Sequence, residues 1–202
     1  MIGDHCTAAI ADAYIKGINN FDIEKAYAAM RRNAFEKSPD SEYTDGKGRR
    51  AIESYLKYGF IPMEDSVKDA YHKCEQSSRT MEYAFDDYAL AQVALKLGKT
   101  DDYNTLMLRS RNYRNVIDSK TGYITGRHTD GRFEKSNPLE FASFITEGTP
   151  CHYTWYVPHD IDGLIGLMGG KKNFTARLDS MFTYQRYWHG NEPCHQIAYL
   201  FP

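Results

Sequence analysis

Apolar residues recur at helical spacing through much of the first half of the chain. The clearest case is the segment 66–97, where apolar side chains three and four positions apart predict one long amphipathic helix. Gly98 follows directly, at the position that a C-terminal cap prefers. The apolar stripe of this helix consists of Met81, Ala84, Phe85, Tyr88, Ala91 and Leu95.

Residues that start and stop helices delimit four further helices in the first half. Gly17 and Gly59 are plausible stops, and Asp22 can cap a helix that begins after it. A polar loop is expected at 38–48 and a turn at 118–122. The four helices are predicted over 7–16, 22–37, 49–58 and 100–117.

The second half has a different pattern. Residues 122–155 are rich in Gly, Thr, Asn, Pro and aromatic residues, which predicts a long loop with room for short strands. Helical spacing returns at 160–167, where Asp160 is an expected N-cap, and at 171–182. Residues 195–201 resemble the first turns of another helix.

Paired helices with long polar and aromatic loops favour a mainly all-α fold of the α/α toroid type. In such a toroid the loops and helix ends at one mouth hold the ligand. A plain helical bundle is the alternative, but the loops that connect helices in such bundles are usually much shorter than 122–155.

Composition excludes some classes of function. The 202 residues carry a net charge of -2, which gives no electrostatic reason to expect nucleic acid as a partner. No apolar run approaches the roughly 20 residues of a membrane span. The four cysteines match no zinc or redox spacing. Aromatic residues make up 14%, including 16 Tyr, and such amphipathic rings suit wet, concave sites that bind sugars.

Two groups of acidic residues are candidates for chemistry. Glu147 stands among Phe144, Tyr153 and Trp155, where partial desolvation would raise its carboxyl pKa toward the range that a general acid needs. An ordinary loop glutamate is the alternative. The adjacent Asp86 and Asp87 lie in the long helix, and we expect at least one to face solvent, since helical neighbours point about 100° apart.

The stretch "YWHGNEPCHQ" near the end of the sequence gathers polar groups on a loop. Its histidines, His189 and His195, are six positions apart, which is not the spacing of a helical zinc pair. The side-chain oxygens of Asn191, Glu192 and Gln196 favour a hard cation such as calcium. A loop that simply forms hydrogen bonds is the alternative.

Several motifs together resemble glycoside hydrolase family 92, in the same order along nearly the whole chain. They are "MIGDH", "DIEKAY", "SRTMEYAFDDYALAQVA", "RSRNYRNVID", "TEGTPCHYTWYVPHDIDGLIGLMGG" and "HGNEPCHQIAYLF". The resemblance implies an exo-acting, inverting α-mannosidase that needs calcium and pairs an N-terminal β-sandwich with a catalytic (α/α)6 barrel.

The resemblance also implies roles for particular residues. Glu147 falls on the general acid of the family. Asp4 and His5, together with His189, Glu192 and His195, are the expected contacts to mannose. The expected calcium ligands are Asn191, Glu192 and Gln196.

The sequence departs from the family pattern in three respects. In "EGTPCHY", Cys151 and His152 replace a Trp and a Gln, which leaves the leaving-group preference open. Cys151 and Pro150 allow a variant specificity, such as mannose linked through phosphate. The β-sandwich has no counterpart in residues 1–202. The later segment that carries the aspartate base has none either.

We therefore expect residues 1–202 to be an internal part of the barrel of an α-mannosidase that acts on mannose-containing glycans, as in N-glycan degradation. The family implies secretion or a periplasmic location. A non-catalytic, truncated piece that binds sugar or folds poorly is the alternative.

Overall fold

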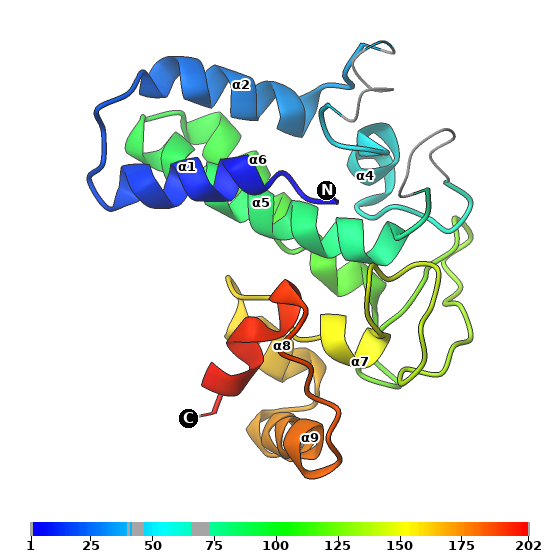
Figure 1. Ribbon diagram of the computed structural model, residues 1–202. Coiled ribbons are helices and arrows are strands. Elements are labelled where there is room, and N and C mark those ends of the chain that lie inside the picture. Colours follow the sequence, from blue (N-terminus) through cyan, green and yellow to red (C-terminus); the bar gives the residue numbers. More distant parts are fainter. Residues whose placement is uncertain (1, 40, 42–46, 66–72, 202) are drawn as a thin grey trace.

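Helices dominate the described part of the chain, which comprises residues 2–39, 41, 47–65 and 73–201 of a computed structural model (Figure 1). The first half contains α1 (His5–Ile15), α2 (Ile23–Phe35), α4 (Ile52–Tyr58), α5 (Gln76–Lys96), α6 (Thr100–Arg109) and the 3-10 helix η1 (Asn112–Val116). The second half contains β1 (Ile117–Asp118), β2 (Tyr123–Ile124), α7 (Pro150–Tyr153), α8 (Ile161–Leu167), α9 (Lys171–Thr183) and the 3-10 helix η2 (Glu192–Tyr199).

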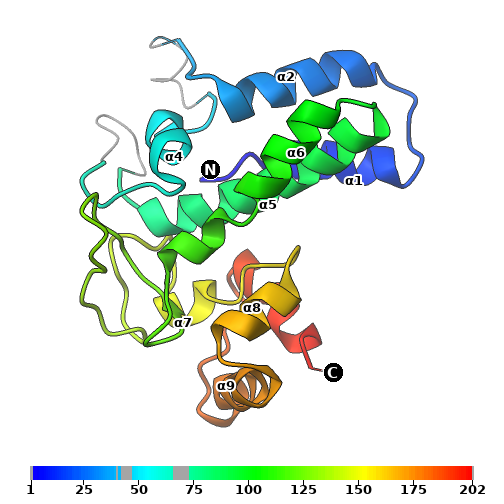
Figure 2. The ribbon, with the colours of Figure 1, turned by 180° about the vertical axis from the view of Figure 1, so that it is seen from behind.

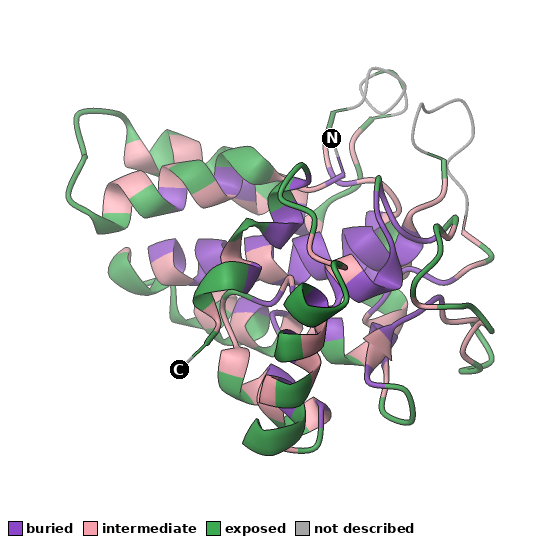
Figure 3. Ribbon diagram, turned by 60° about the horizontal axis from the view of Figure 1, so that its bottom comes forward, coloured by how far each residue is buried: buried purple, intermediate pink, exposed green. Residues whose placement is uncertain are grey.

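Helix α5 runs through the middle of the molecule. It packs against α1, α2 and α6 on one side, and the segments α7, α8, α9 and η2 gather on the other (Figures 1 and 2). Figure 3 shows the buried residues concentrated along this helix, of whose 21 residues 16 are buried. The prediction of a mainly helical fold is confirmed.

Two apolar clusters flank α5. One contains Leu90 with Tyr27 of α2 and Leu106 of α6. The other contains Met81 with residues of the second half, among them Trp155. The predicted apolar stripe is wrong at Leu95, which is 54% exposed, because Val93 and Ala94 are the buried residues of that turn. The remaining stripe residues are buried or half-buried.

Predicted helix ends agree with the structure at several points. The Asp22 carboxylate accepts a hydrogen bond from the Lys25 N–H (3.0 Å), and the Asp160 carboxylate accepts one from the Gly163 N–H (3.0 Å). Gly59 and Gly98 follow α4 and α5 with φ angles of +71°, a conformation that glycine adopts without a steric penalty. These caps fix where α2, α4, α5 and α8 begin or end.

Two predicted helices are shorter than expected. The helix predicted over 66–97 begins only at Gln76; residues 66–72 lie outside the described part. The helix predicted over 100–117 ends at Arg109, and the chain then tightens into η1. Ser110 marks the break, because its hydroxyl donates to the Met107 carbonyl (2.8 Å) and its own carbonyl accepts from His159 Nε2 (2.8 Å).

The segment predicted as a long loop contains more structure than the pattern showed. Ile117 pairs with Ile124 in a two-stranded antiparallel hairpin. Strand β2 is one of the short strands expected within 122–155, whereas its partner β1 lies before that segment. Helix α7 was not predicted; Thr149 caps it, and the His152 ring accepts from the Thr149 N–H in return (3.2 Å). Residues 195–201 were predicted to start an α-helix, but η2 is a 3-10 helix that begins at Glu192.

The prediction that Asp86 or Asp87 faces solvent is wrong, because both side chains are fully buried. Asp87 forms ion pairs with Arg49 and, at 2.8 Å, with Arg109, so two guanidinium groups compensate its charge. Asp86 accepts a hydrogen bond from the Asp4 N–H (2.7 Å), but its Oδ1 has no partner among the described residues.

Glu82 lies one turn before Asp86 and is equally buried. Burial raises the pKa of the Glu82 carboxyl to about 8, with a smaller contribution from the nearby charge of Asp86. Burial also raises the pKa of Asp86 to about 7, although the positive charge of Arg49 opposes the shift. Both carboxyls therefore stay largely protonated in the folded protein at mildly acidic pH.

These two carboxyls predict that the protein loses stability as the pH rises. Between about pH 4 and pH 8 the folded state keeps protons that the unfolded chain has released, so the free energy of unfolding falls by up to about 1.4 kcal/mol per pH unit for each carboxyl. Chemical denaturation at several pH values measures this slope. The variant Glu82→Gln/Asp86→Asn should have a flatter profile than the wild type, and a profile of unchanged slope would contradict the assignment.

Candidate active site

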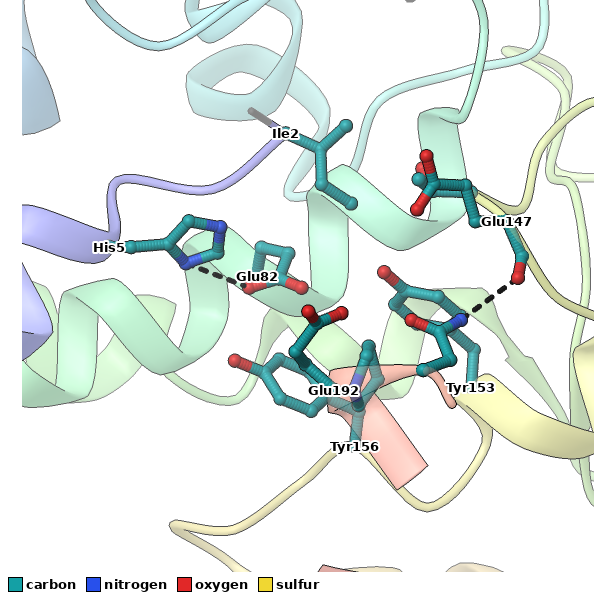
Figure 4. A pocket seen from close by; sticks show the side chains of 10 residues that line it. Ile2, His5, Glu82, Glu147, Tyr153, Tyr156 and Glu192 are labelled. Atoms are coloured by element: carbon teal, nitrogen blue, oxygen red, sulfur yellow. Dashed lines mark hydrogen bonds and ion pairs between the residues drawn. The ribbon is translucent and has the colours of Figure 1, made fainter. Parts of the chain in front are cut away.

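A cavity of about 560 Å³ lies where the N-terminal segment, α5 and the loops of the second half meet (Figure 4). Three carboxylic acids line it: Glu82, Glu147 and Glu192. The other lining residues combine polar and apolar groups, and they are Ile2, His5, Thr146, Tyr153, Tyr156, Asn191 and Pro193.

The segment before Glu147 is held by the start of α5. The Phe144 carbonyl accepts hydrogen bonds from the N–H groups of Ser77 (3.1 Å) and Ser78 (3.2 Å), which belong to the first turn of the helix. The Ser78 hydroxyl in turn accepts from the Thr146 N–H (2.9 Å). The loop therefore caps α5, and the helix fixes the position of Glu147.

Glu147 is tied to a second loop through its backbone. Its carbonyl accepts a hydrogen bond from Asn191 Nδ2 (2.9 Å), across 44 positions of sequence. Its φ of +49° is an uncommon conformation for a residue with a side chain. The Glu147 side chain is exposed, so the expectation that aromatic neighbours desolvate it is wrong; the nearby Trp155 is buried in the core below the loop.

The second loop places Glu192 at the cavity. Glu192 opens η2 and is exposed, whereas Asn191 before it and Pro193 after it are buried. Proline fixes one backbone angle at this point, which stiffens the loop. Glu147 and Glu192 thus line the same cavity, together with Tyr153 and Tyr156.

Glu82 forms a buried part of the wall, unlike the other two acids. Its Oε2 has no hydrogen-bond partner among the described residues, and His5 Nδ1 lies 3.8 Å away (Figure 4). Partial burial lowers the pKa of His5, so its imidazole is mainly neutral at pH 7. The sequence analysis did not identify Glu82 as a residue of the site. An acidic residue within the apolar "TMEYAF" stretch of a helix could have indicated a buried carboxyl there.

The structure brings only some of the predicted site residues to the cavity. His5, Glu147, Asn191 and Glu192 line it. The other four, Asp4, His189, His195 and Gln196, are not among the residues that line it, and their roles stay predictions.

These four side chains have other contacts. The Asp4 carboxylate accepts from the Thr7 hydroxyl (2.8 Å) and lies 3.7 Å from Arg49 Nε. The His195 ring stacks on His189 with centroids 4.5 Å apart, and its Nε2 lies 3.0 Å from the His189 carbonyl.

Two of the expected calcium ligands, Asn191 and Gln196, can offer a side-chain carbonyl oxygen to a cation. Asn191 uses its amide nitrogen on the Glu147 carbonyl, and Gln196 directs its own toward the Trp155 carbonyl (3.4 Å). The side-chain carbonyl oxygens of both therefore remain as acceptors, which is the donor type that calcium takes. Within the described ranges, no group of three or more His, Cys, Asp or Glu residues is arranged to hold a metal ion.

The arrangement suits an uncharged ligand with many hydroxyl groups. Exposed carboxylates at Glu147 and Glu192 can accept hydrogen bonds, and the rings of Tyr153 and Tyr156 can contact C–H faces. As for membranes, no helix in the described part of the chain has the length and hydropathy needed to cross one.

Comparisons with known proteins find relatives among glycoside hydrolases. The chain is similar to a family GH92 alpha-mannosidase from Bacteroides thetaiotaomicron, with 39% identity and a TM-score of 0.85 over 99% of this chain and 25% of that one. A structure of the same mannosidase in complex with mannoimidazole matches at 36% identity and a TM-score of 0.85, over 99% of this chain and 27% of that one. A family GH92 inverting mannosidase from the same organism matches at 30% identity and a TM-score of 0.84, over 99% and 29%.

A curated sequence is also similar, an uncharacterized secreted glycosidase from Arthroderma benhamiae. It is 29% identical over 225 residues, which cover 98% of this chain. The chain spans between a quarter and a third of the length of these relatives. The model of the glycosyl hydrolase family 92 catalytic domain matches residues 1–202, and the chain therefore belongs to this family.

Proposed function

We propose that the protein to which this chain belongs is a glycoside hydrolase that releases terminal α-linked mannose from glycans. One observation carries this proposal. Glu147 and Glu192 lie on loops 45 positions apart in sequence, yet both line the same cavity. The similarity to alpha-mannosidases, one of them solved with mannoimidazole, supports mannose as the sugar.

Glu147 is the proposed general acid. Its proton passes to the glycosidic oxygen as the bond from that oxygen to the anomeric carbon breaks. A water molecule attacks the opposite face of the sugar and gives its proton to a second carboxylate, so the anomeric configuration inverts. Inversion requires the two carboxyl groups to be roughly 6.5–9.5 Å apart. We propose that the second carboxylate is an aspartate outside residues 1–202.

Asn191, Glu192 and Gln196 are the proposed calcium ligands of this chain. They would offer two amide oxygens and a carboxylate, a donor set that calcium prefers and zinc does not. The bound ion would supply positive charge to orient sugar hydroxyls. Because calcium takes six to eight oxygens, other segments, water and the sugar complete the proposed shell.

The domain organisation and the cellular location that we propose follow from the relatives of the chain. We propose that residues 1–202 form part of an (α/α)6 barrel, which is paired with a β-sandwich in the whole protein. Similarity to a secreted glycosidase supports a secreted or periplasmic location.

Among the described residues that line the cavity there is no lysine or arginine, the side chains that would favour the alternative specificity for mannose linked through phosphate. The two departures from the family motif lie elsewhere: Cys151 is buried with its Sγ 3.3 Å from Met181 Sδ, and His152 Nε2 lies 2.9 Å from the Arg186 carbonyl. The Cys151 side chain therefore packs in the core, and the His152 ring hydrogen-bonds within the fold.

The role of Glu147 predicts a large loss of activity in Glu147→Gln. Without the general acid, kcat/KM for an α-mannobiose should fall by about 10²–10⁴-fold. An aryl mannoside, whose leaving group needs no protonation, should lose much less. Steady-state kinetics on both substrates measures the difference. Glu140→Gln is a matched control, since Glu140 is exposed on the same loop and bonds to Asn137 (2.8 Å). Equal losses on both substrates would contradict a general-acid role.

The proposed location of the base predicts that the isolated 202-residue chain does not hydrolyse mannosides. General acid without general base should leave the rate lower by about 10²–10⁴-fold. Assays of the purified chain and of the full-length natural polypeptide on the same mannobiose test this. Turnover by the isolated chain at the full-length rate would show that the base lies within residues 1–202.

The calcium proposal predicts reversible inactivation by a chelator. The full-length natural polypeptide should lose activity when calcium is removed and regain it on addition of calcium. Glu192→Ala should shift this recovery to higher calcium concentrations, because a charged ligand is lost. The isolated chain should bind calcium poorly in calorimetry, since it supplies too few oxygens. Activity that is unchanged by chelation would remove calcium from the mechanism.

A further inference from the structure

The imidazole of His152 connects two loops that are far apart in sequence. Its Nδ1 accepts a hydrogen bond from the Thr149 N–H (3.2 Å), and its Nε2 lies 2.9 Å from the Arg186 carbonyl. Thr149 lies two positions after Glu147, in the turn that carries this acid. Arg186 belongs to the segment that leads from α9 to Glu192. One side chain therefore ties together the two loops that bring the exposed acids to the cavity.

The partners of the His152 ring determine its chemical form. A backbone N–H can only donate a hydrogen bond, and a backbone carbonyl can only accept one. Nδ1 must therefore be unprotonated and Nε2 must carry the hydrogen, which is a neutral form of imidazole. Partial burial lowers the pKa of His152, so the neutral ring predominates at pH 7. Both hydrogen bonds can then exist at the same time.

The Arg186 end of this tie is anchored to α9. The N–H groups of Arg186 (2.7 Å) and Tyr187 (2.9 Å) both donate to the Met181 carbonyl in the last turn of that helix. The Met181 side chain is buried in the core. The carbonyl that accepts from His152 therefore has a fixed position, and the ring can transmit that position to the turn that carries Glu147.

Two connections between the loops meet next to Glu147. Its carbonyl accepts from Asn191 Nδ2 (2.9 Å). A Cβ atom on the following Gly148 would lie 3.2 Å from Asn191 Nδ2 and 3.4 Å from His152 Nδ1, so both side chains approach the backbone here. The φ of Glu147, +49°, is a sparsely populated conformation that persists only when surrounding contacts maintain it. His152 provides such a contact without being among the residues that line the cavity.

We propose that His152 is a positioning residue for the general acid. By holding Thr149 at the anchored Arg186 carbonyl, the ring keeps the Glu147 carboxyl where it can protonate the glycosidic oxygen. This inference rests on the proposed function and adds to it a residue that does not touch the sugar. A general acid works only within hydrogen-bond reach of the atom that it protonates, so a small displacement of the turn is costly.

The substitution His152→Leu in the full-length natural polypeptide tests this proposal. Leucine forms neither hydrogen bond. The kcat for an α-mannobiose should fall by about 10–10²-fold, the loss expected when a catalytic group is misplaced, with little change in KM. Hydrolysis of an aryl mannoside, whose leaving group needs no protonation, should fall much less. Because loss of packing alone would lower both rates together, the ratio of the two rates separates positioning from a structural role.

Two further variants serve as controls. His152→Gln should retain most of the mannobiose rate, because its amide can accept from Thr149 through oxygen and donate to Arg186 through nitrogen. His159→Leu removes a comparable bond, from His159 Nε2 to the Ser110 carbonyl (2.8 Å), at a histidine that is not among the residues lining the cavity. It should lower stability in chemical denaturation and leave the ratio of the two rates as in the wild type.

The double variant Glu147→Gln/His152→Leu tests whether His152 acts through Glu147. Its activity on the mannobiose should equal that of Glu147→Gln alone, because a turn without the acid has no catalytic proton to misplace. Losses that multiply in the double variant would show that His152 acts independently of Glu147, and they would overturn the proposal.

The single variants can also overturn the proposal. If His152→Leu lowers both rates by the same factor, or lowers neither, His152 does not position the acid although the protein is a mannosidase. Should His152→Leu fail to fold, His152→Asn takes its place, since its shorter amide does not span both partners and should show the same selective loss. A wild type that hydrolyses neither substrate would overturn the proposed function, and this inference with it.

Discussion

A single buried carboxylate, that of Asp87, links four helices of the first half, α2, α4, α5 and α6. It forms ion pairs with Arg49 and Arg109, and it accepts a hydrogen bond from the Tyr55 hydroxyl of α4 (3.1 Å). Arg109 also donates to the Ala34 carbonyl of α2 (2.8 Å). Segments of α2, α4, α5 and α6 therefore meet at one charge. Leaving such a charge unpaired costs about 3–5 kcal/mol, so each partner depends on the others.

The other face of α5 follows the opposite electrostatic rule. Asp87 is compensated by two guanidinium groups. Glu82 and Asp86 are buried with at most partial compensation, and burial raises the pKa of both carboxyls, to about 8 and about 7. The compensated side is packed against helices, and Glu82 borders the cavity. One helix thus carries both an ion-paired carboxylate, at Asp87, and two buried carboxyls whose pKa is raised, at Glu82 and Asp86.

Local signals made much of the fold predictable from the sequence. Helix spacing, Asp22, Asp160 and the glycines located most helices, and the motif resemblance brought Glu147 and Glu192 to one site. Long-range effects were not predictable in this way. The burial of Asp86 and Asp87 depends on Arg49 and Arg109, which lie far from them in sequence. The break at Ser110 depends on His159, whose bond to the Ser110 carbonyl spans 49 positions.

The bond from Asn191 to the Glu147 carbonyl bears on how the protein folds. It closes a loop of 44 residues that contains α7, α8 and α9. Loop-closure entropy opposes such a contact until the helices inside the loop have formed and shortened the distance between its ends. We therefore expect the two halves of the cavity to join late in folding. On this view, α7, α8 and α9 are already formed when Asn191 bonds to the Glu147 carbonyl. The cavity would then form only after most of the second half has folded.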